Sequence, residues 1–272
     1  MQARIALAAS EVSVDLARPL DLALALDFSA AQPRHFGAPP ASARAFETAG
    51  FNGSVARGAS CNCELITLIP HCNGTHTECA GHLTRERLDA WRVAPAGLVP
   101  AVLVSVACGL AGGESSEPPP QAGDRLVTRS ALERGWPRVI PFAPQALVIR
   151  TLPNSTDKRT RDWDREIPPY LSREAAQYLV EQGILHLVVD LPSIDRSHDA
   201  GRLTAHRIFF GLPPGSAELG AATRTGATIT ELAFVPDSAP DGAYLLALQL
   251  PALGGDAVPS RPLLYSLAAA RS

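Results

Sequence analysis

The sequence predicts one strand-rich α/β domain, and two observations lead to that prediction. Short apolar runs rich in β-branched residues recur along the chain at the length of buried strands. One of these runs follows directly after a capped helical segment, as in a helix-to-strand unit of a sheet protein. The chain has 272 residues, of which 46% are hydrophobic and 19% charged, so it can bury a sizeable core. We therefore expect residues 1–272 to form a single domain.

The apolar runs give the expected strands. A first strand is expected in residues 1–10, and the others in residues 22–26, 65–69, 101–107, 146–151, 185–190, 228–234 and 244–250. Two helices are expected: one over 128–134, opened by Thr128, and one over 172–182, opened by Ser172 and ended at Gly183. Stretches rich in Pro and Gly at 30–41, 109–123, 212–225 and 252–262 indicate surface loops.

Charge and hydropathy exclude two classes of partner. The formal net charge is −3 and no long basic run occurs, so the chain lacks the electrostatic signature of a protein that binds nucleic acid or anionic membrane. No apolar stretch reaches the roughly 18 residues that a membrane span requires. Five cysteines are an odd number, and four of them lie between positions 61 and 79 beside two histidines. This clustering favours reduced thiols near a metal in a cytoplasmic protein.

Potential metal ligands cluster immediately after the strand expected at 65–69. Cys72 is followed by His76, Glu78 and His82, and two glycines between them allow the backbone to turn tightly. Thiolate, imidazole and carboxylate together form a donor set typical of zinc and its neighbours. The chain contains no Gly-x-Ser-x-Gly, phosphate-binding Gly-Lys-Ser/Thr or Gly-x-Gly-x-x-Gly motif, which argues against serine hydrolases, nucleotide hydrolases and dinucleotide oxidoreductases.

The spacing of this cluster resembles the pattern His-x-Gly-Thr-His-x-Asp-x-x-x-His of the cyclase family, which includes bacterial kynurenine formamidases. Gly74-Thr75-His76 and His82 fall in register with that pattern. Later segments are also similar: Asp-Leu-Pro-Ser-Ile-Asp at 190–195, Leu-Thr-Ala-His ending at His206, and Thr-Ile-Thr-Glu ending at Glu231. The closing segments 242–251 and 260–264 resemble the family's last strands.

The resemblance implies a swivelling β/β/α fold and a binuclear metal site. It places one metal at Cys72, His76, Glu78 and Glu231, and a second at Glu78, His206 and Glu231. His82 falls on the family's proton donor and acceptor. Phe36 loosely matches an aromatic residue that packs against the substrate. The resemblance also implies a homo-oligomer, a homodimer or homotetramer.

Two departures from the family pattern bear on the metal. Cys72 stands where the family has a histidine, and Glu78 where it has an aspartate. A thiolate favours Zn²⁺ over Mn²⁺, although Mn²⁺ stays possible, and the longer carboxylate leaves one metal instead of two as an alternative. His71 could supply the missing imidazole if the loop shifts by one residue, although strand alternation would aim it at the opposite face.

The remaining cysteines and histidines are interpreted as packed side chains. Free cysteine behaves as a compact hydrophobe, so we expect the other cysteines of the cluster to be buried: Cys61, Cys63 and Cys79. The same interpretation applies to the histidines at 35, 186 and 198.

The resemblance implies a metal-dependent hydrolase that attacks an amide, formamide, cyclic amide or lactone carbonyl of a small molecule. The family includes enzymes that hydrolyse N-formylkynurenine and enzymes that open isatin, so an arylformamidase-like amidohydrolase is expected. An alternative is a non-catalytic protein that keeps the fold and binds a metal or small molecule. His82 argues against this alternative, because a protein that only binds metal has no need of a proton-transfer histidine.

Overall fold

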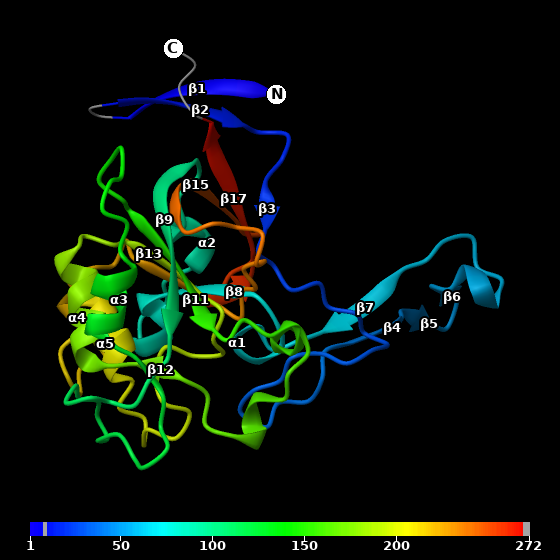
Figure 1. Ribbon diagram of the computed structural model, residues 1–272. Helices are drawn as coiled ribbons and strands as arrows, with labels where there is room; N and C mark the ends of the chain where they lie inside the picture. The colour runs from blue at the N-terminus through cyan, green and yellow to red at the C-terminus, as the bar shows by residue number, and fades with distance from the viewer. Residues whose placement is uncertain (8–9, 269–272) are drawn as a thin grey trace.

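One large mixed sheet dominates the computed structural model, which describes residues 1–7 and 10–268 (Figure 1). Its strands lie in the order β1 (Gln2–Leu7), β2 (Ser10–Asp15), β17 (Arg261–Ala268), β15 (Gly242–Gln249), β9 (Val99–Ala107), β11 (Ala146–Leu152), β13 (His186–Val189), β14 (Thr228–Glu231), β8 (His76–Cys79) and β16 (Ala257–Pro259). A short strand, β3 (Leu20–Asp21), pairs with β17. The mixed α/β, strand-rich class predicted from the sequence is confirmed.

Short helices and three small sheets complete the described chain. The helices are α1 (Pro70–Asn73), α2 (Ala90–Val93), α3 (Arg129–Gly135), α4 (Arg173–Glu181) and α5 (Thr204–Phe210). Two-stranded sheets pair β4 (Ser42–Ala45) with β7 (Glu64–Thr67), β5 (Glu47–Thr48) with β6 (Phe51–Asn52), and β10 (Leu126–Val127) with β12 (Tyr170–Leu171). Single 3₁₀ turns are η1 (Val55–Arg57), η2 (Ala80–Leu83), η3 (Thr156–Arg159), η4 (Trp163–Arg165) and η5 (Leu219–Ala221). Within the described residues, no helix has the length and hydropathy to cross a membrane.

Strand direction defines the edge of the sheet at which functional side chains from several strands can lie close together. Strands β9, β11, β13 and β14 run parallel, while β8 runs antiparallel to β14 and β16 antiparallel to β8. The carboxyl ends of β13 and β14 therefore lie at the same edge as the beginning of β8. In sheets of this kind ligands bind at the carboxyl ends of the parallel strands.

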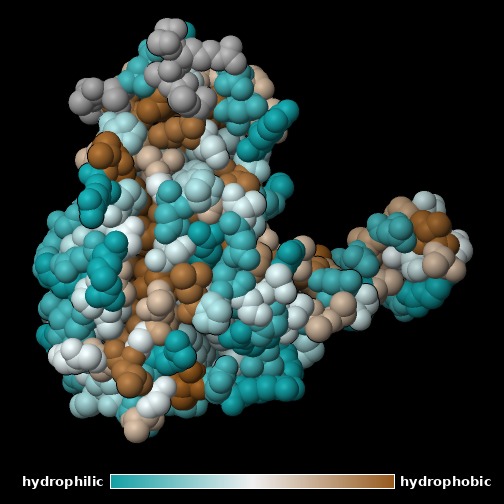
Figure 2. All heavy atoms as spheres, in the orientation of Figure 1, coloured by the Kyte–Doolittle hydropathy of each residue, from teal (hydrophilic) through white to brown (hydrophobic). Residues whose placement is uncertain are grey.

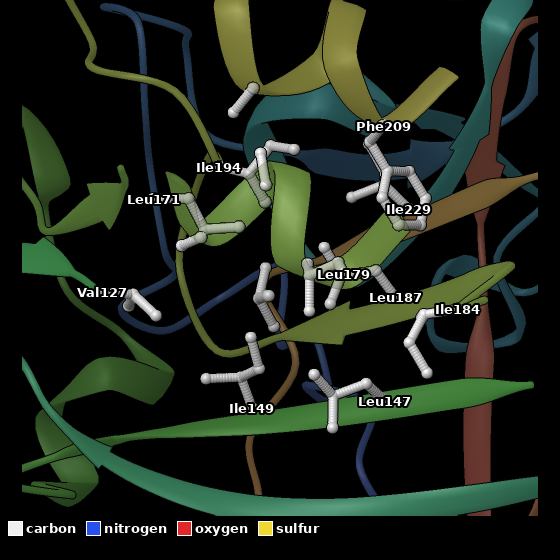
Figure 3. Close-up of a cluster of buried hydrophobic side chains, with 14 of the residues drawn as sticks. Val127, Leu147, Ile149, Leu171, Leu179, Ile184, Leu187, Ile194, Phe209 and Ile229 are labelled. Atoms are coloured by element: carbon white, nitrogen blue, oxygen red, sulfur yellow. The ribbon is translucent and has the colours of Figure 1, made fainter. Parts of the chain in front are cut away.

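The main core lies between the sheet and α3, α4 and α5, which cover one of its faces (Figure 1). Alternation along β11 sends Leu147 and Ile149 into this core and Val148 into a second core on the other face. Leu179 from α4 and Phe209 from α5 pack over the same face (Figure 3). Helices α3 and α4 have the N-caps expected from the sequence. The side chain of Thr128 accepts a backbone hydrogen bond at the start of α3, and that of Ser172 does so at the start of α4.

A two-stranded arm, formed by β4 to β7, projects from the body of the molecule (Figures 1 and 2). It exposes several large apolar side chains: Phe46, Phe51, Val55, Leu65 and Ile66. Cys61 and Cys63 lie in this arm and are exposed. The expectation that they are buried is wrong, because a two-stranded ribbon has no core in which to bury them. Cys79 is buried as expected, and all five cysteines are free.

Four other expectations differ from the structure. Residues 22–26 form no strand, because their amides bond elsewhere: Leu22 N–H donates to the Pro262 carbonyl and Leu24 N–H to Thr75 Oγ1. Strand β14 ends at Glu231 instead of residue 234, since Leu232 has a φ of 52°, which a strand cannot contain. The segment 252–262, expected as a loop, contains the edge strand β16. His198 is exposed, whereas the histidines at 35 and 186 are buried.

Truncating the centre of the main core is expected to destabilise the fold. Leu147→Ala should lower the free energy of unfolding by about 2–5 kcal/mol, because the fully buried side chain leaves a cavity between β11 and the helices. Leu253→Ala, at a side chain that is 55% exposed, should change it by less than about 0.5 kcal/mol. Urea denaturation followed by circular dichroism measures both, and equal losses would contradict this description of the core.

Candidate metal centre

Strand β8 presents two candidate metal ligands on one face. His76 and Glu78 are two residues apart, so their side chains point to the same side of the sheet, and both are fully buried. Thr77 points the opposite way, and its hydroxyl bonds to Thr230 Oγ1 at 2.7 Å and to Ser260 Oγ at 2.8 Å. These hydrogen bonds hold β8 between β14 and β16 and fix the direction in which its ligands point.

Glu231 and His206 reach the same point from β14 and α5. Glu231 lies opposite His76 in the β8–β14 register, with His76 Nε2 3.5 Å from Glu231 Oε2. His206 Nε2 lies 2.9 Å from Glu78 Oε1 and 3.5 Å from Glu231 Oε1. The two carboxylates and the two imidazoles therefore face one another, although they come from three elements far apart in the sequence.

Two further histidines close the group. His71 lies on α1, and its Nδ1 is 3.1 Å from Glu78 Oε2. His82 lies on η2, and its Nε2 is 3.9 Å from the same oxygen. His71 precedes His76 by five positions instead of the four in the family pattern, and the single turn of α1 absorbs the additional residue. Cys72, the next residue on that turn, is buried.

The described residues contain three groups of side chains close enough to hold a cation. They are His71, His76 and Glu78; Glu78, His82 and His206; and His71, His82 and Asp256, with ligand atoms in each group within 4.8 Å of one another. Glu78 belongs to two of them, which is the geometry of a bridging carboxylate. Cys72 belongs to none of the three.

Unpartnered buried atoms indicate that a cation fits here. His76 Nε2 is buried and makes no hydrogen bond to the described residues. The buried oxygens of Glu78 face imidazole nitrogens at 2.9–3.9 Å, but no well-aligned hydrogen bond satisfies them. A buried polar atom without a partner costs free energy, so such atoms call for an occupant that the protein does not itself supply. Imidazole nitrogens and carboxylate oxygens are acceptors, and a divalent cation such as Zn²⁺ satisfies them together.

Hydrogen bonds behind the ligands orient their rings. His206 Nδ1 lies 2.7 Å from Asp195 Oδ2, and His76 Nδ1 lies 3.0 Å from the Gly74 carbonyl oxygen. Each contact places a proton on Nδ1 and leaves Nε2 facing the cluster. Metal-binding histidines ordinarily show this arrangement, because the outer hydrogen bond fixes the tautomer that presents a lone pair to the cation.

The charges in the cluster are strongly coupled. Burial would raise the pKa of Glu78, but the imidazoles of His82, His206 and His71 hold it well below its usual value. Burial would lower the pKa of His206, yet the carboxylates of Glu78, Asp195 and Glu231 raise it well above its usual value. The pKa of His71 rises to about 10, because Asp256 and Glu78 outweigh the effect of burial.

The pKa of the Cys72 thiol is raised, whereas a bound cation would lower the pKa of a thiol ligand. Burial raises the pKa of Cys72, and the negative charges of Asp164 and Glu231 raise it further. A thiol must lose its proton to bind a metal, so this environment favours the neutral thiol in the metal-free protein.

The cluster opens into a cavity of about 760 Å³. Phe36, Ala200 and Leu203 form part of its wall, together with the ligand side chains. All three have positive φ values, 55°, 57° and 47°, and Leu232, next to Glu231, has the fourth positive φ among described non-glycine residues. Strained backbone of this kind persists where the surrounding structure holds it, and it gathers at functional sites. The strain therefore marks the same site as the ligand geometry.

The structure brings together most of the site residues that the sequence indicated. His76, Glu78, His206, Glu231 and His82 converge, and Phe36, with a side chain 56% exposed, lies on the wall of the same cavity. Sequence reasoning missed Asp256, which lies in a Gly-rich segment with no ligand-like spacing. Asp195 stood in a segment similar to the family but was given no role, and its contact with His206 depends on the fold.

Comparison with known proteins identifies the family of this chain. The family model described as "Putative cyclase" matches residues 14–196, and the chain belongs to that family. No curated protein matches the chain.

Solved structures share the fold at low sequence identity. A predicted metal-dependent hydrolase from Bacillus stearothermophilus is 16% identical, with a TM-score of 0.57 over 91% of this chain and 98% of that one. Isatin hydrolase A from Labrenzia aggregata, bound to benzyl benzoate, is 18% identical, with a TM-score of 0.57 over 92% of this chain and 94% of that one. Isatin hydrolase A from Ralstonia solanacearum is 16% identical, with a TM-score of 0.55 over 91% of each chain.

Metal binding at this cluster is expected to release protons. With a pKa of about 10, His71 is protonated at neutral pH in the metal-free protein, and it must lose that proton before its Nδ1 can bind a cation. If binding releases one proton, zinc affinity should therefore fall by about tenfold for each unit by which the pH is lowered between pH 8 and 6. Calorimetry in two buffers of different ionisation enthalpy measures the protons released, and a value of zero would contradict this charge state.

Proposed function

We propose that this protein is a metal-dependent hydrolase that attacks the carbonyl of a small amide, formamide, cyclic amide or lactone. The observation that supports this proposal is the buried set of imidazoles and carboxylates, with unpartnered ligand atoms, on the wall of a cavity. Such a set polarises a carbonyl and activates water when it holds a divalent cation.

Two cations, of which zinc is the proposed species, would share Glu78. His71, His76 and Glu78 would hold the first, and Glu78, His206 and Glu231 the second. We assign the first position to His71 instead of Cys72, because His71 Nδ1 is 3.1 Å from Glu78 Oε2 whereas Cys72 belongs to none of the ligand groups in the described chain. Three histidines and two carboxylates suit zinc.

Bound cations supply Lewis acidity, which makes water a nucleophile near neutral pH. His82 is assigned the proton transfer because it lies on the cavity wall and its Nε2 is 3.9 Å from Glu78 Oε2. His71 and His206 lie closer to the Glu78 carboxylate, at 3.1 Å and 2.9 Å, and are assigned to the metal. His82 Nε2 can take a proton from the attacking water and pass it to the leaving nitrogen or oxygen. The cavity wall positions the substrate, with Phe36 available to stack on a planar ring.

The structural neighbours support a cyclic aromatic amide as the first substrate to test. Two of the similar structures are isatin hydrolases, and another is an isatin hydrolase bound to the product analogue thioisatinate. We therefore propose isatin-like cyclic amides and N-formyl aromatic amines as the starting panel.

Removing His82 should separate chemistry from metal binding. His82→Ala is expected to retain the zinc content of the wild type while its kcat falls by about 100-fold or more, the usual contribution of a general acid and base. Elemental mass spectrometry and assays of the panel measure the two effects. Zinc without hydrolysis of any compound in the wild-type protein would favour the non-catalytic alternative, and unchanged turnover in the variant would remove His82 from the mechanism.

Paired variants at adjacent positions should identify the first ligand. His71→Ala is expected to lose about one of the two zinc ions, because it removes one of three donors around the first position. Cys72→Ser is expected to retain both ions. The two substitutions lie on the same turn of α1, so each controls for local disruption by the other. Loss of zinc in Cys72→Ser alone would restore the thiolate as the ligand.

A further inference from the structure

Asp256 lies behind two of the histidines that face Glu78. Its Oδ2 is 2.9 Å from His71 Nε2 and 3.2 Å from His82 Nδ1. The opposite nitrogen of each ring points to Glu78 Oε2, at 3.1 Å for His71 and 3.9 Å for His82. One carboxylate oxygen thus contacts the outer nitrogen of both rings, and Glu78 Oε2 faces the inner nitrogen of both.

The backbone of Asp256 is hydrogen-bonded to strand β8, which carries His76 and Glu78. Its carbonyl accepts a hydrogen bond from Cys79 N–H at 3.0 Å, and the following residue, Ala257, pairs with Glu78 in the β8–β16 register. Asp256 does not line the cavity. Its position is therefore fixed relative to Glu78, and its carboxylate contacts the histidines from outside the space that a substrate would occupy.

We propose that Asp256 is a positioning residue that sets the tautomer and ring orientation of His82 and His71 together. This inference rests on the proposed hydrolytic function. Because Asp256 accepts a hydrogen bond from each ring, the proton of each neutral imidazole lies on the outer nitrogen, and the inner nitrogen keeps a free lone pair. For His71 that lone pair serves a cation, and for His82 it serves proton transfer.

The proton balance follows from this arrangement. His82 Nε2 takes a proton from the attacking water, whose oxygen forms a bond to the carbonyl carbon. The bond from carbon to the leaving atom then breaks, the electron pair stays on the leaving atom, and His82 Nε2 returns the proton to it. The Nδ1 proton stays on His82 throughout and is donated in a hydrogen bond to Asp256, whose carboxylate stabilises the imidazolium that forms between the two steps.

The tautomer of His82 tests this role without any substrate. In zinc-loaded protein, two-dimensional ¹H–¹⁵N spectra of the imidazoles, assigned with a His82→Gln variant, should show His82 as the Nδ1–H tautomer. Asp256→Asn should reduce the population of that tautomer, because its amide can also turn a donor towards the ring. Asp21→Asn is the matched control: the Asp21 side chain is 41% exposed and paired with Arg261, and that of Asp256 is 40% exposed.

Kinetics test whether the contact acts through His82. Assayed at saturating zinc, Asp256→Asn should lower kcat by about 100-fold and leave KM unchanged, as expected for loss of general acid and base catalysis. Its zinc affinity should fall by about 10- to 100-fold, because Asp256 also orients His71. In a His82→Ala background the same substitution should have a much smaller effect, because the two residues act as a unit. Asp21→Asn should leave kcat, KM and zinc unchanged.

Three results would overturn the proposal. An unchanged His82 tautomer in Asp256→Asn would show that Asp256 does not orient the ring. A zinc affinity equal to that of the wild type would show that Asp256 does not orient His71, and an equal loss of kcat with and without His82 would make its effect independent of that histidine. If wild-type protein hydrolyses nothing in the panel, the proposed function fails, while the imidazole spectra still decide the role of Asp256.

Discussion

The buried carboxylate of Glu78 is the constraint on which the rest of the site depends. A charged group with no exposure is stable only when opposite charges and ligands surround it. Three elements near β8 each supply one such neighbour: α1 brings His71, η2 brings His82 and α5 brings His206. The same arrangement that stabilises Glu78 therefore assembles a centre that can hold a divalent cation.

The sheet determines where this carboxylate can lie. Strand β8 runs antiparallel to β14 at the end of a parallel set, so its first residues meet the carboxyl end of β14 and place His76 against Glu231. The strand also ends at this edge of the sheet, because Leu232, directly after Glu231, has a positive φ. Strand pairing and local strain together bring distant side chains to one point.

Local patterns predicted the parts of the molecule that depend on neighbouring residues. Capped helices such as α4 and buried strands such as β11 follow from side-chain periodicity, and the ligands of β8 follow from their spacing and the family resemblance. Contacts between distant segments could not be predicted this way. Asp256 lies 174 residues from His82, and only the pairing of β16 with β8 brings the two together. The exposed cysteines of the arm were missed because residue type alone does not show that a segment leaves the core.

The choice between His71 and Cys72 is the central test, and zinc K-edge X-ray absorption of the metal-loaded protein addresses it most directly. Ligation by His71 predicts a shell of nitrogen and oxygen near 2.0–2.1 Å with imidazole scattering beyond it and no sulfur. A sulfur shell near 2.3 Å would show that the Cys72 thiolate binds the metal and would contradict the ligand set assigned here.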